Sequence, residues 1–594
     1  MASFAVGALG CAASARPAAQ DPNAKAGTTN APTAFGSRPP FVVSIVVDQL
    51  AAWVADERVP TLPESGGFAR LRREGTWVHD VRYDHAVTDT APGHASLYTG
   101  TPPRASGIVA NELVDESTGK RVSFLRDPRV RVVSRRGTED LVGASIAALR
   151  VPSFADRLRA RRPETFVASF SLKDRGAIFA GGTRPDASIW FDTKLDTFVT
   201  STAFADHLPG WLGDTVEPST VARLRERPWQ PDDLAWLRAH AKTADASEGE
   251  GDLEGLGVTF PHFAARAKNP AVAFRATPGG DRALLGMALR AADEAKRRNV
   301  PGLLAISFSS NDYVGHAFGP DSWEAWDELR SLDATLAELF GALDRTFGPE
   351  GWAALLTADH GTVSMPEARH AACGVRPHDA ADPWERPCGD ARSSGRIVPD
   401  ELRDSLRAAL RGAALDPSFV AGVADPYVHL SSKAEALPAS ERAALLRVLV
   451  AALSNDPHVG EVFDPRMLPA TCPPPGDTSV AALVCRSSRG DVRGALYVTP
   501  KRGSFFDASV VVGKGTSHGS PYLFDRMVPL FVRSPRAPST SPAPRDVRTT
   551  QSFASFDATL ADLFDVDPTD RSAPSFADAR RSLLPGRPRP PSSP

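Results

Sequence analysis

Residues 41–48 read FVVSIVVD, an almost unbroken run of apolar and β-branched residues that stops at Asp48. Such a run is typical of a central parallel strand that is covered on both faces of its sheet. Three more runs of this kind each stop at a polar cluster, namely Thr165–Leu172 before Lys173, Gly302–Phe308 before Ser309, and Trp352–Thr357 before Ala358.

Helical patterns lie between these runs, at residues 153–161, 281–298 and 323–347. Alternation of strands and helices predicts an α/β fold with an open, mostly parallel sheet flanked by helices. In such sheets ligands bind beyond the carboxyl ends of the strands, which is where the polar clusters lie. We therefore expect the functional site at that edge.

Two segments interrupt the alternation and are predicted to be inserted caps, at about 190–277 and about 365–493. The domain that contains them is predicted to span residues 41–572. A leader at 1–40 precedes it, and a Pro-rich, disordered tail at 573–594 follows it. After the second insertion, Gly494–Val498 and Ser509–Val512 are predicted strands through which the chain returns to His518.

The composition excludes several classes of protein. The chain has 594 residues, of which 42% are hydrophobic and 23% charged, as in ordinary globular proteins. Its formal net charge of −3 gives no electrostatic basis for a nucleic acid partner or an anionic membrane surface. No apolar run reaches the roughly 18 residues of a membrane-spanning helix.

The first 19 residues, MASFAVGALGCAASARPAA, resemble the end of a secretory signal, although they lack a positively charged start. Cys11 is the candidate for a lipid anchor, and the alternative is an Ala-rich disordered leader. The other four cysteines form two local pairs, which predict the disulfides Cys373–Cys388 and Cys472–Cys485 unless all four are free thiols. Together these features predict an extracytoplasmic protein, periplasmic or lipid-anchored.

Carboxylate and imidazole side chains gather after the predicted strands. Asp312 and His316 are four residues apart, so on a helix they face the same side. Asp359 and His360 are adjacent, so they can converge only beyond the strand end, where Gly361 permits a turn. With Asp48 and His518 these residues make two sets of nitrogen and oxygen ligands, a composition suited to zinc.

Thr90 lies in the segment TDTAPGHASLYTG, residues 88–100. Ala91-Pro92 predicts the start of a helix with Thr90 at the N-cap, where the backbone N–H groups favour an anion. A threonine in this place is either a nucleophile or only a capping residue.

Six motifs resemble, in the same order, those of the alkaline phosphatase superfamily, in particular the phosphate-irrepressible, zinc-dependent alkaline phosphatases with a threonine nucleophile. The motifs are VVDQ around Asp48, TDTAPGHASLYTG around Thr90, SLKDRGAI around Lys173, SFSSNDYVGHAFGP around Asp312, TADHG around Asp359, and GTSHGSPYLFDRMVPLF around His518.

The resemblance implies two Zn²⁺ ions per chain, one held by Asp312, His316 and His518. The other would be held by Asp48, Asp359 and His360, with Thr90 completing its ligands. It also implies that Asn111, Lys173 and Arg175 contact the transferred phosphoryl oxygens. For His94 we expect only a hydrogen bond.

Two geometric and chemical arguments accompany this resemblance. Lys173 and Arg175 are two residues apart at a predicted strand end, so on extended chain they would share a face. Thr90 without a following C-x-P-x-R pattern argues against a sulfatase.

The expected activity is hydrolysis of small phosphate monoesters through a phospho-threonine intermediate. Three alternatives remain open: a phosphodiesterase or nucleotide pyrophosphatase of the same superfamily, a phosphonate hydrolase or phosphomutase relative, and an inactive binding protein.

Overall fold

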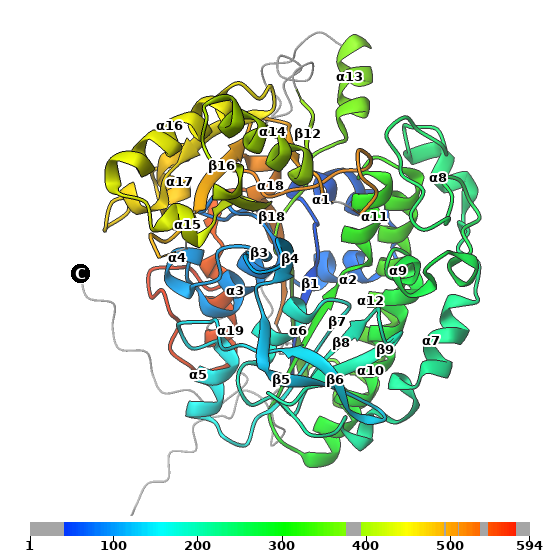
Figure 1. Ribbon diagram of the computed structural model, residues 1–594. Helices are drawn as coiled ribbons and strands as arrows, with labels where there is room; N and C mark the ends of the chain where they lie inside the picture. Colours follow the sequence, from blue (N-terminus) through cyan, green and yellow to red (C-terminus); the bar gives the residue numbers. More distant parts are fainter. Residues whose placement is uncertain (1–40, 376–393, 492–494, 509, 535–544, 578–594) are drawn as a thin grey trace, which may run out of the picture. The chain divides into compact units, whose positions relative to one another are not determined.

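A sheet of 12 strands runs through the computed structural model, which describes residues 41–375, 394–491, 495–508, 510–534 and 545–577. Figure 1 shows its arrangement. In spatial order its strands are β19 (Arg545–Val547), β2 (Thr76–Arg82), β18 (Met527–Arg533), β11 (Trp352–Thr357), β1 (Phe41–Val47), β10 (Gly302–Phe308), β7 (Phe166–Ser171), β8 (Ala187–Asp192), β9 (Thr197–Ser201), β5 (Arg126–Ser134) and β6 (Gly137–Ala144), with β20 (Gln551–Ser552) also paired to β2.

The middle of this sheet is parallel. Phe41 at the start of β1 pairs with Gly302 of β10 on one side and Trp352 of β11 on the other. Strand β10 pairs in turn with β7, and every residue of these four strands is buried. Strands made of such apolar runs are stable only when both faces of the sheet are covered. The pairing confirms the predicted α/β fold with a mostly parallel sheet.

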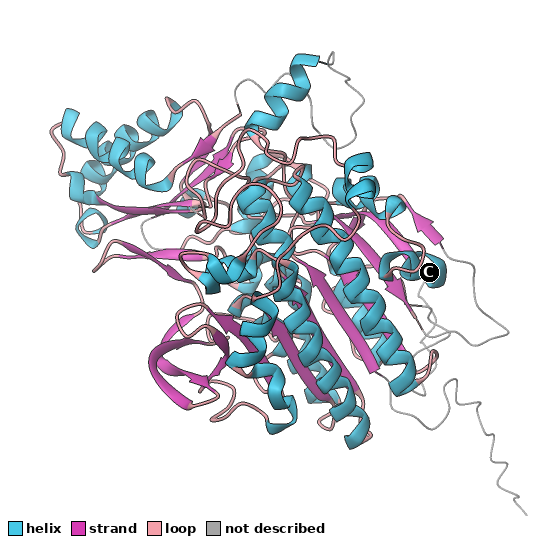
Figure 2. Ribbon diagram, turned by 90° about the vertical axis from the view of Figure 1, so that its right-hand side faces the viewer, coloured by secondary structure: helices cyan, strands magenta, loops and turns pink. Residues whose placement is uncertain are grey.

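Helices pack along the strands (Figure 2). Helix α12 (Trp323–Phe347) packs against α2 (Gly67–Glu74) and α10 (Pro278–Arg298), and helix α3 (Thr90–Thr99) packs against α5 (Phe154–Arg161), α6 (Asp174–Gly181) and α19 (Ala554–Phe564). Helix α12 begins where the Ser322 side chain accepts a hydrogen bond from Ala325 N, and it ends at Gly348 with φ 82°. Its buried Leu332, Leu336 and Leu339 recur every three or four residues, as an amphipathic helix requires.

Shorter elements connect these layers. They are α1 (Ala52–Arg58), α4 (Pro103–Ser106), the hairpin β3 (Glu112–Asp115) and β4 (Lys120–Ser123), α7 (Pro218–Arg225), α8 (Leu234–His240), α9 (Pro270–Arg275), α11 (Ser310–Phe318), α13 (Pro366–Val375) and α18 (Leu523–Arg526). Trp190, where the first predicted insertion begins, lies in strand β8 of the main sheet.

A second core lies in what we call the inserted unit, residues 394–491 and 495–508. Its antiparallel sheet has the order β13 (Val420–Ala424), β14 (Tyr427–Leu430), β16 (Ala495–Pro500) and β15 (Val459–Phe463). Its other elements are β12 (Arg396–Ile397), α14 (Pro399–Gly412), α15 (Ser432–Glu435), α16 (Ala439–Ser454), α17 (Val480–Ser487) and β17 (Phe505–Phe506). Buried aliphatic residues of α14 and α16 pack on this sheet and form a cluster of their own.

Two predicted strands differ from the structure. The strand predicted at 494–498 exists as β16, but it pairs with β14 and β15 in the smaller sheet, because its apolar residues complete that core. Residues 510–512, predicted as a strand, form bends and a turn instead. Residue 509 lies outside the described residues. A short apolar run alone does not distinguish a strand from a packed turn.

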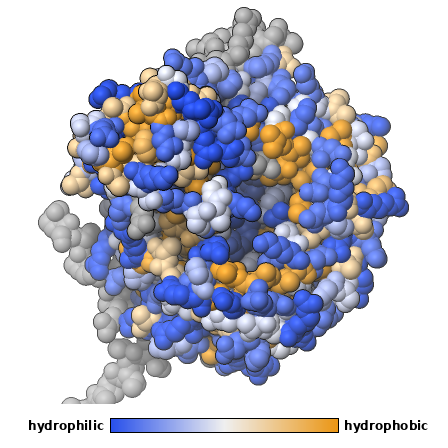
Figure 3. Space-filling model, in the orientation of Figure 1, coloured by the Kyte–Doolittle hydropathy of each residue, from blue (hydrophilic) through white to orange (hydrophobic). Residues whose placement is uncertain are grey.

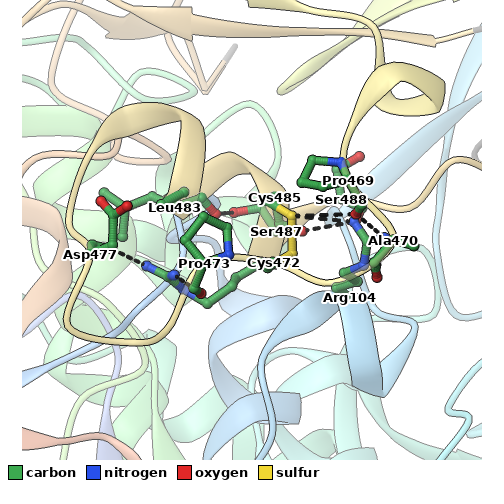
Figure 4. Close-up of a disulfide and its surroundings, with 12 residues drawn as sticks. Arg104, Pro469, Ala470, Cys472, Pro473, Asp477, Leu483, Cys485, Ser487 and Ser488 are labelled. Carbon is green, nitrogen blue, oxygen red and sulfur yellow. Dashed lines mark hydrogen bonds between the residues drawn. A yellow bond between two sulfur atoms is a disulfide. The ribbon is translucent and has the colours of Figure 1, made fainter.

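The disulfide Cys472–Cys485 is present, with a Cα–Cα distance of 5.7 Å. Figure 4 shows Arg104 beside it, donating hydrogen bonds to the Cys485 carbonyl at 3.2 Å and the Pro469 carbonyl at 2.9 Å. Because Arg104 lies in α4, these bonds join the cross-linked loop to that helix. In the predicted Cys373–Cys388 pair, Cys388 lies outside the described residues. The leader 1–40 and the tail from residue 578 lie outside them as well.

Within the described residues, no helix combines the length and the apolar character needed to span a membrane.

Candidate active site

The carboxyl ends of four neighbouring strands bear the polar side chains that the sequence singles out. Strands β11, β1, β10 and β7 lie side by side, and they lead to Asp359, Asp48, Asp312 and Lys173 respectively. Because these strands are parallel, their carboxyl ends meet at one edge of the sheet. The sheet order therefore brings together residues that are far apart in sequence.

Asp312, His316 and His518 form the first group. Helix α11 places Asp312 and His316 one turn apart, with Asp312 Oδ1 3.2 Å from His316 Nε2. His518 Nε2 lies 3.6 Å from the same oxygen. One ligand atom from each residue lies within 4.8 Å of the others, and all three residues are buried.

Asp48, Asp359 and His360 form the second group under the same distance limit. His360 Nε2 is 3.4 Å from Asp48 Oδ1 and 3.6 Å from Asp359 Oδ2. The His360 and His518 rings stack with centroids 3.7 Å apart, so the two groups adjoin. Each group is the set of residues that the family resemblance assigns to one ion.

Backbone carbonyls orient all three imidazoles. His316 Nδ1 lies 2.9 Å from Thr516 O, and His518 Nδ1 lies 2.9 Å from Thr88 O. His360 Nδ1 lies 3.0 Å from Gly361 O. Because a carbonyl oxygen only accepts, each Nδ1 donates, so Nε2 is the ring nitrogen through which each histidine can bind a cation. Metal-binding histidines are held in this way.

Unpaired polar atoms test whether these groups suit a cation. His360 Nε2 and Asp48 Oδ1 are buried without a hydrogen-bond partner, and both residues are 0% exposed. Burying such atoms unpaired is costly, so a ligand from outside the chain is expected between them. The residues thus fit two metal ions, with the nitrogen and oxygen donors that zinc accepts.

Lys173 joins both groups to Thr90. Its Nζ lies 2.7 Å from Asp48 Oδ2 and 2.6 Å from Asp312 Oδ2, and it donates a 3.1 Å hydrogen bond to Thr90 Oγ1. Burial alone would lower the pKa of Lys173, but the two carboxylates raise it above its ordinary value. The lysine is therefore a charged group at the centre of the site.

Thr90, predicted at the N-cap, is instead the first residue of helix α3, and Asp89 is the N-cap. The close packing of α3 against the strand end places Thr90 here, since a Cβ on Gly93 would lie 2.2 Å from Asp359 O. His94 Nδ1 lies 3.0 Å from Thr90 O, in the hydrogen-bonding role that we expected, and also 3.0 Å from Asp359 Oδ2.

Asn111 and Arg175 lie on other elements around the same site. Asn111 Oδ1 accepts a 2.7 Å hydrogen bond from Ala91 N, so the side-chain N–H groups of Asn111 take no part in this bond. Lys173 is the N-cap of α6 and Arg175 lies in its first turn, so the argument from one extended strand was wrong. The chain turns into the helix directly after the strand, so the two residues do not lie on one extended segment.

A cavity of about 610 Å³ adjoins these residues, and Figure 3 shows a hollow in the middle of this face. Its lining includes Asn111, Arg175, Asp312, His316 and His518. Residues of the β3–β4 hairpin and of the inserted unit line it as well. Thr90 and Lys173 are not among the lining residues, but Lys173 contacts the lining residue Asp312.

Sequence reasoning missed two carboxylates. Asp89 Oδ1 lies 3.1 Å from His518 Nδ1, and its place directly before Thr90 was a usable signal. Asp425, in the turn between β13 and β14, lines the cavity with no local signal. Burial and the neighbouring Asp89 raise the pKa of Asp425 well above its ordinary value.

Comparisons with known proteins agree with this geometry. Residues 42–380 match the family model for type I phosphodiesterases and nucleotide pyrophosphatases. Alkaline phosphatase PhoV of Synechococcus elongatus is 35% identical over 337 residues, which cover 56% of this chain and 60% of that protein. Alkaline phosphatase PafA of Elizabethkingia meningoseptica is 33% identical over 337 residues, which cover 55% of this chain and 60% of that protein. The chain thus matches less than two thirds of the length of these relatives.

The crystal structure of wild-type alkaline phosphatase PafA has a TM-score of 0.74 to this chain at 25% identity, covering 89% of this chain and 96% of the other. The likeness therefore includes the inserted unit as well as the main sheet. Since the family model covers more than half of its residues, the chain belongs to the type I phosphodiesterase and nucleotide pyrophosphatase family, and within the alkaline phosphatase superfamily it groups with the PafA-like alkaline phosphatases.

Proposed function

We propose that the protein hydrolyses phosphate monoesters, with Thr90 as the nucleophile and two zinc ions as cofactors. The observation that carries this proposal is the position of Lys173 Nζ, which contacts Thr90 Oγ1, Asp48 of one metal group and Asp312 of the other. Nucleophile, cation and both groups therefore meet within one buried site.

The Asp312 group and the Asp48 group would each hold one zinc ion, and Thr90 would complete the second set of ligands. Zinc bound there supplies positive charge that lowers the pKa of a bound hydroxyl and stabilises charge on the leaving oxygen.

The chain's own residues account for the transfer steps. The Thr90 hydroxyl gives up its proton to solvent, its Oγ forms a bond to phosphorus, and the bond from phosphorus to the leaving oxygen breaks. That oxygen takes a proton from solvent. The oxygen of a water molecule then bonds to the phosphorus of phospho-threonine and releases a proton to solvent. The Oγ–phosphorus bond breaks, Thr90 Oγ takes up a proton from solvent, and inorganic phosphate leaves.

Three side chains would hold the phosphoryl group during these steps. The lysine is a compact charge and the arginine a planar fork, and both suit non-bridging phosphate oxygens. Asn111 would donate its amide N–H groups from the cavity lining. The N-terminal, positive end of the α3 helix dipole lies beside Thr90 and favours negative charge there.

The second candidate function is phosphodiester or pyrophosphate hydrolysis, because the matching family model is that of type I phosphodiesterases and nucleotide pyrophosphatases. One assay separates the two functions. Purified protein is given an aryl phosphate monoester and the matching diester, before and after chelation and after zinc is added back. We expect kcat/KM to favour the monoester, and both activities to need zinc. Preference for the diester would establish the second candidate, and full activity in metal-free protein would exclude the zinc mechanism.

We also propose that the protein acts outside the cytoplasm, periplasmic or lipid-anchored at Cys11. The disulfide Cys472–Cys485 supports this proposal, since such bonds persist in oxidising compartments. Fractionation of cells that express the full chain tests it, with mass spectrometry of the mature N-terminus to detect cleavage before Cys11 and its lipidation. A protein that remains in the cytoplasm with an intact leader would contradict it.

A further inference from the structure

Gln49 follows Asp48 at the end of the central strand β1, and its backbone is strained. Its φ is 69°, in the left-handed region that residues other than glycine, asparagine and aspartate seldom occupy. The side chain is 2% exposed and points into the protein. A strained, buried polar residue at a site indicates that its surroundings hold it there for a reason.

The contacts of Gln49 give that reason. Its backbone N–H donates to Asp359 Oδ1 at 3.2 Å, and its side-chain amide Nε2 donates to Asp312 Oδ1 at 3.0 Å. Asp359 belongs to one metal group and Asp312 to the other. Gln49 is therefore bonded to a carboxylate of each group.

The sheet order explains how one residue reaches both groups. Strand β1 lies between β11, which leads to Asp359, and β10, which leads to Asp312. A residue just beyond the end of β1 has the two neighbouring strand ends on either side. The positive φ of Gln49 turns the chain there, so that the main-chain N–H and the side chain serve the two sides separately.

Helix α11 is shaped to admit this side chain. A Cβ built on Gly315 would lie 2.0 Å from Gln49 Oε1, so only glycine leaves room for the amide. Gly315 lies one residue before His316, in the helix that carries two members of the first group. The amide thus packs against the element that it orients.

We propose that Gln49 is a positioning residue that holds the Asp312 group in its metal-binding arrangement through its amide and contacts the Asp48 group only through its backbone. This inference rests on the proposed two-zinc function. A neutral amide suits the role, because it directs a carboxylate without adding positive charge that would compete with a cation. Partners of this kind typically change metal affinity by about 10- to 100-fold.

The division between backbone and side chain makes the proposal testable. Gln49→Gly removes the amide, keeps the N–H to Asp359, and suits a positive φ. Gln49→Glu keeps the size of the side chain but carries no N–H donor when ionised. The matched control is Asn299→Gly, an exposed residue with φ 53° at the end of α10, away from the site.

The measurement is zinc retained per chain against increasing chelator concentration, on the full-length protein. His316→Ala and His360→Ala identify which release step belongs to which group. For both Gln49 variants we expect the step of the Asp312 group to shift by about 10- to 100-fold toward easier release, with the other step unchanged. Asn299→Gly should match the wild type.

Two results would overturn the proposal: unchanged release in both Gln49 variants, or an equal shift of both steps, which would indicate general loosening of the fold. Circular dichroism and thermal unfolding check that each variant folds. Should Gln49→Gly fail to fold, Gln49→Glu decides alone. Failure of the proposed function is recognised separately, because the wild type itself would then retain no zinc or hydrolyse no monoester.

Discussion

The strand-end site and the inserted unit are built on opposite principles. At the site Asp48, Asp359 and His360 are fully buried, and Asp48 Oδ1 and His360 Nε2 have no hydrogen-bond partner. The core of the inserted unit is aliphatic, with Leu445, Leu449 and Leu453 of α16 all at 0% exposure. One region needs ligands from outside the chain, while the other completes its packing with its own side chains.

This difference teaches where stability and activity should separate. Apolar packing in the inserted unit contributes to folding without touching the reacting atoms, whereas the crowded, buried carboxylates at the site cost stability until a cation is bound. The two regions meet at the cavity, where the inserted unit contributes Asp425. Changes at the strand ends should therefore remove activity with little effect on the fold, and changes in the α16 core should do the reverse.

The largest effect is expected for Thr90→Ala. Without the hydroxyl there is no nucleophile, so monoester turnover should fall by several powers of ten. Zinc content and the unfolding midpoint should stay close to wild type, because Thr90 adds little to the core. Thr90→Ser keeps a hydroxyl and is the matched control. Acid quenching of the wild type should trap phosphate on the Thr90 peptide, and turnover by Thr90→Ala at the wild-type rate would leave Thr90 as a helix-capping residue.

The double variant Lys173→Ala, Arg175→Ala comes next. A monoester offers more charge and one more non-bridging oxygen than a diester, so it has more to lose from these two cations. We expect monoester kcat/KM to fall by several powers of ten and diester kcat/KM to fall far less. Steady-state kinetics on the matched aryl esters measure both values. Equal losses would mean that Lys173 holds the site together without selecting the substrate.

Leu449→Ala should show the opposite behaviour. Removing a fully buried leucine leaves a cavity, which costs about 2–5 kcal/mol of unfolding free energy. Well below the unfolding temperature, kcat/KM for the monoester should remain near wild type. Val450→Ala, at a position 36% exposed, is the control and should cost far less. A large loss of activity in folded Leu449→Ala would show that the inserted unit and the site are coupled.

A smaller effect is expected for the double variant Cys472→Ser, Cys485→Ser. The disulfide closes a short loop, with a sequence separation of 13, and a loop of this size contributes about 3 kcal/mol at most through chain entropy. The Arg104 hydrogen bonds to neighbouring carbonyls should retain part of the loop's position. Chemical denaturation of oxidised, reduced and variant protein measures the difference, and identical curves would show that the cross-link adds nothing.

The smallest effect concerns Asp333 of α12, a buried carboxylate away from the site. Burial raises its pKa to about 6 from an ordinary 3.8, although it accepts a 2.8 Å hydrogen bond from Phe68 N. The folded state therefore binds the proton more tightly than the unfolded state, and stability should fall as pH rises from about 4 to about 6. Asp333→Asn cannot ionise, so its unfolding midpoint should lack this decrease. Parallel slopes for variant and wild type in this window would refute the assignment.

Local sequence determined the main elements and part of the site. The strands at 41–47, 302–308 and 352–357 lie where continuous apolar runs predict them, because such runs can be buried only between two layers. Asp312 and His316 face one another because residues four apart share a helix face. Information of this kind lies within a few residues and needs no knowledge of the fold.

The tertiary structure alone decided which strand ends adjoin, and through them how the site is connected. Lys173 reaches Asp48 and Asp312 because β7, β10 and β1 are neighbours in the sheet, an order set by long-range pairing. The same order lets Gln49 contact both groups, and the fold of the inserted unit brings Asp425 to the cavity. These contacts depend on burial and pairing between distant segments, which the local periodicity of a sequence does not encode.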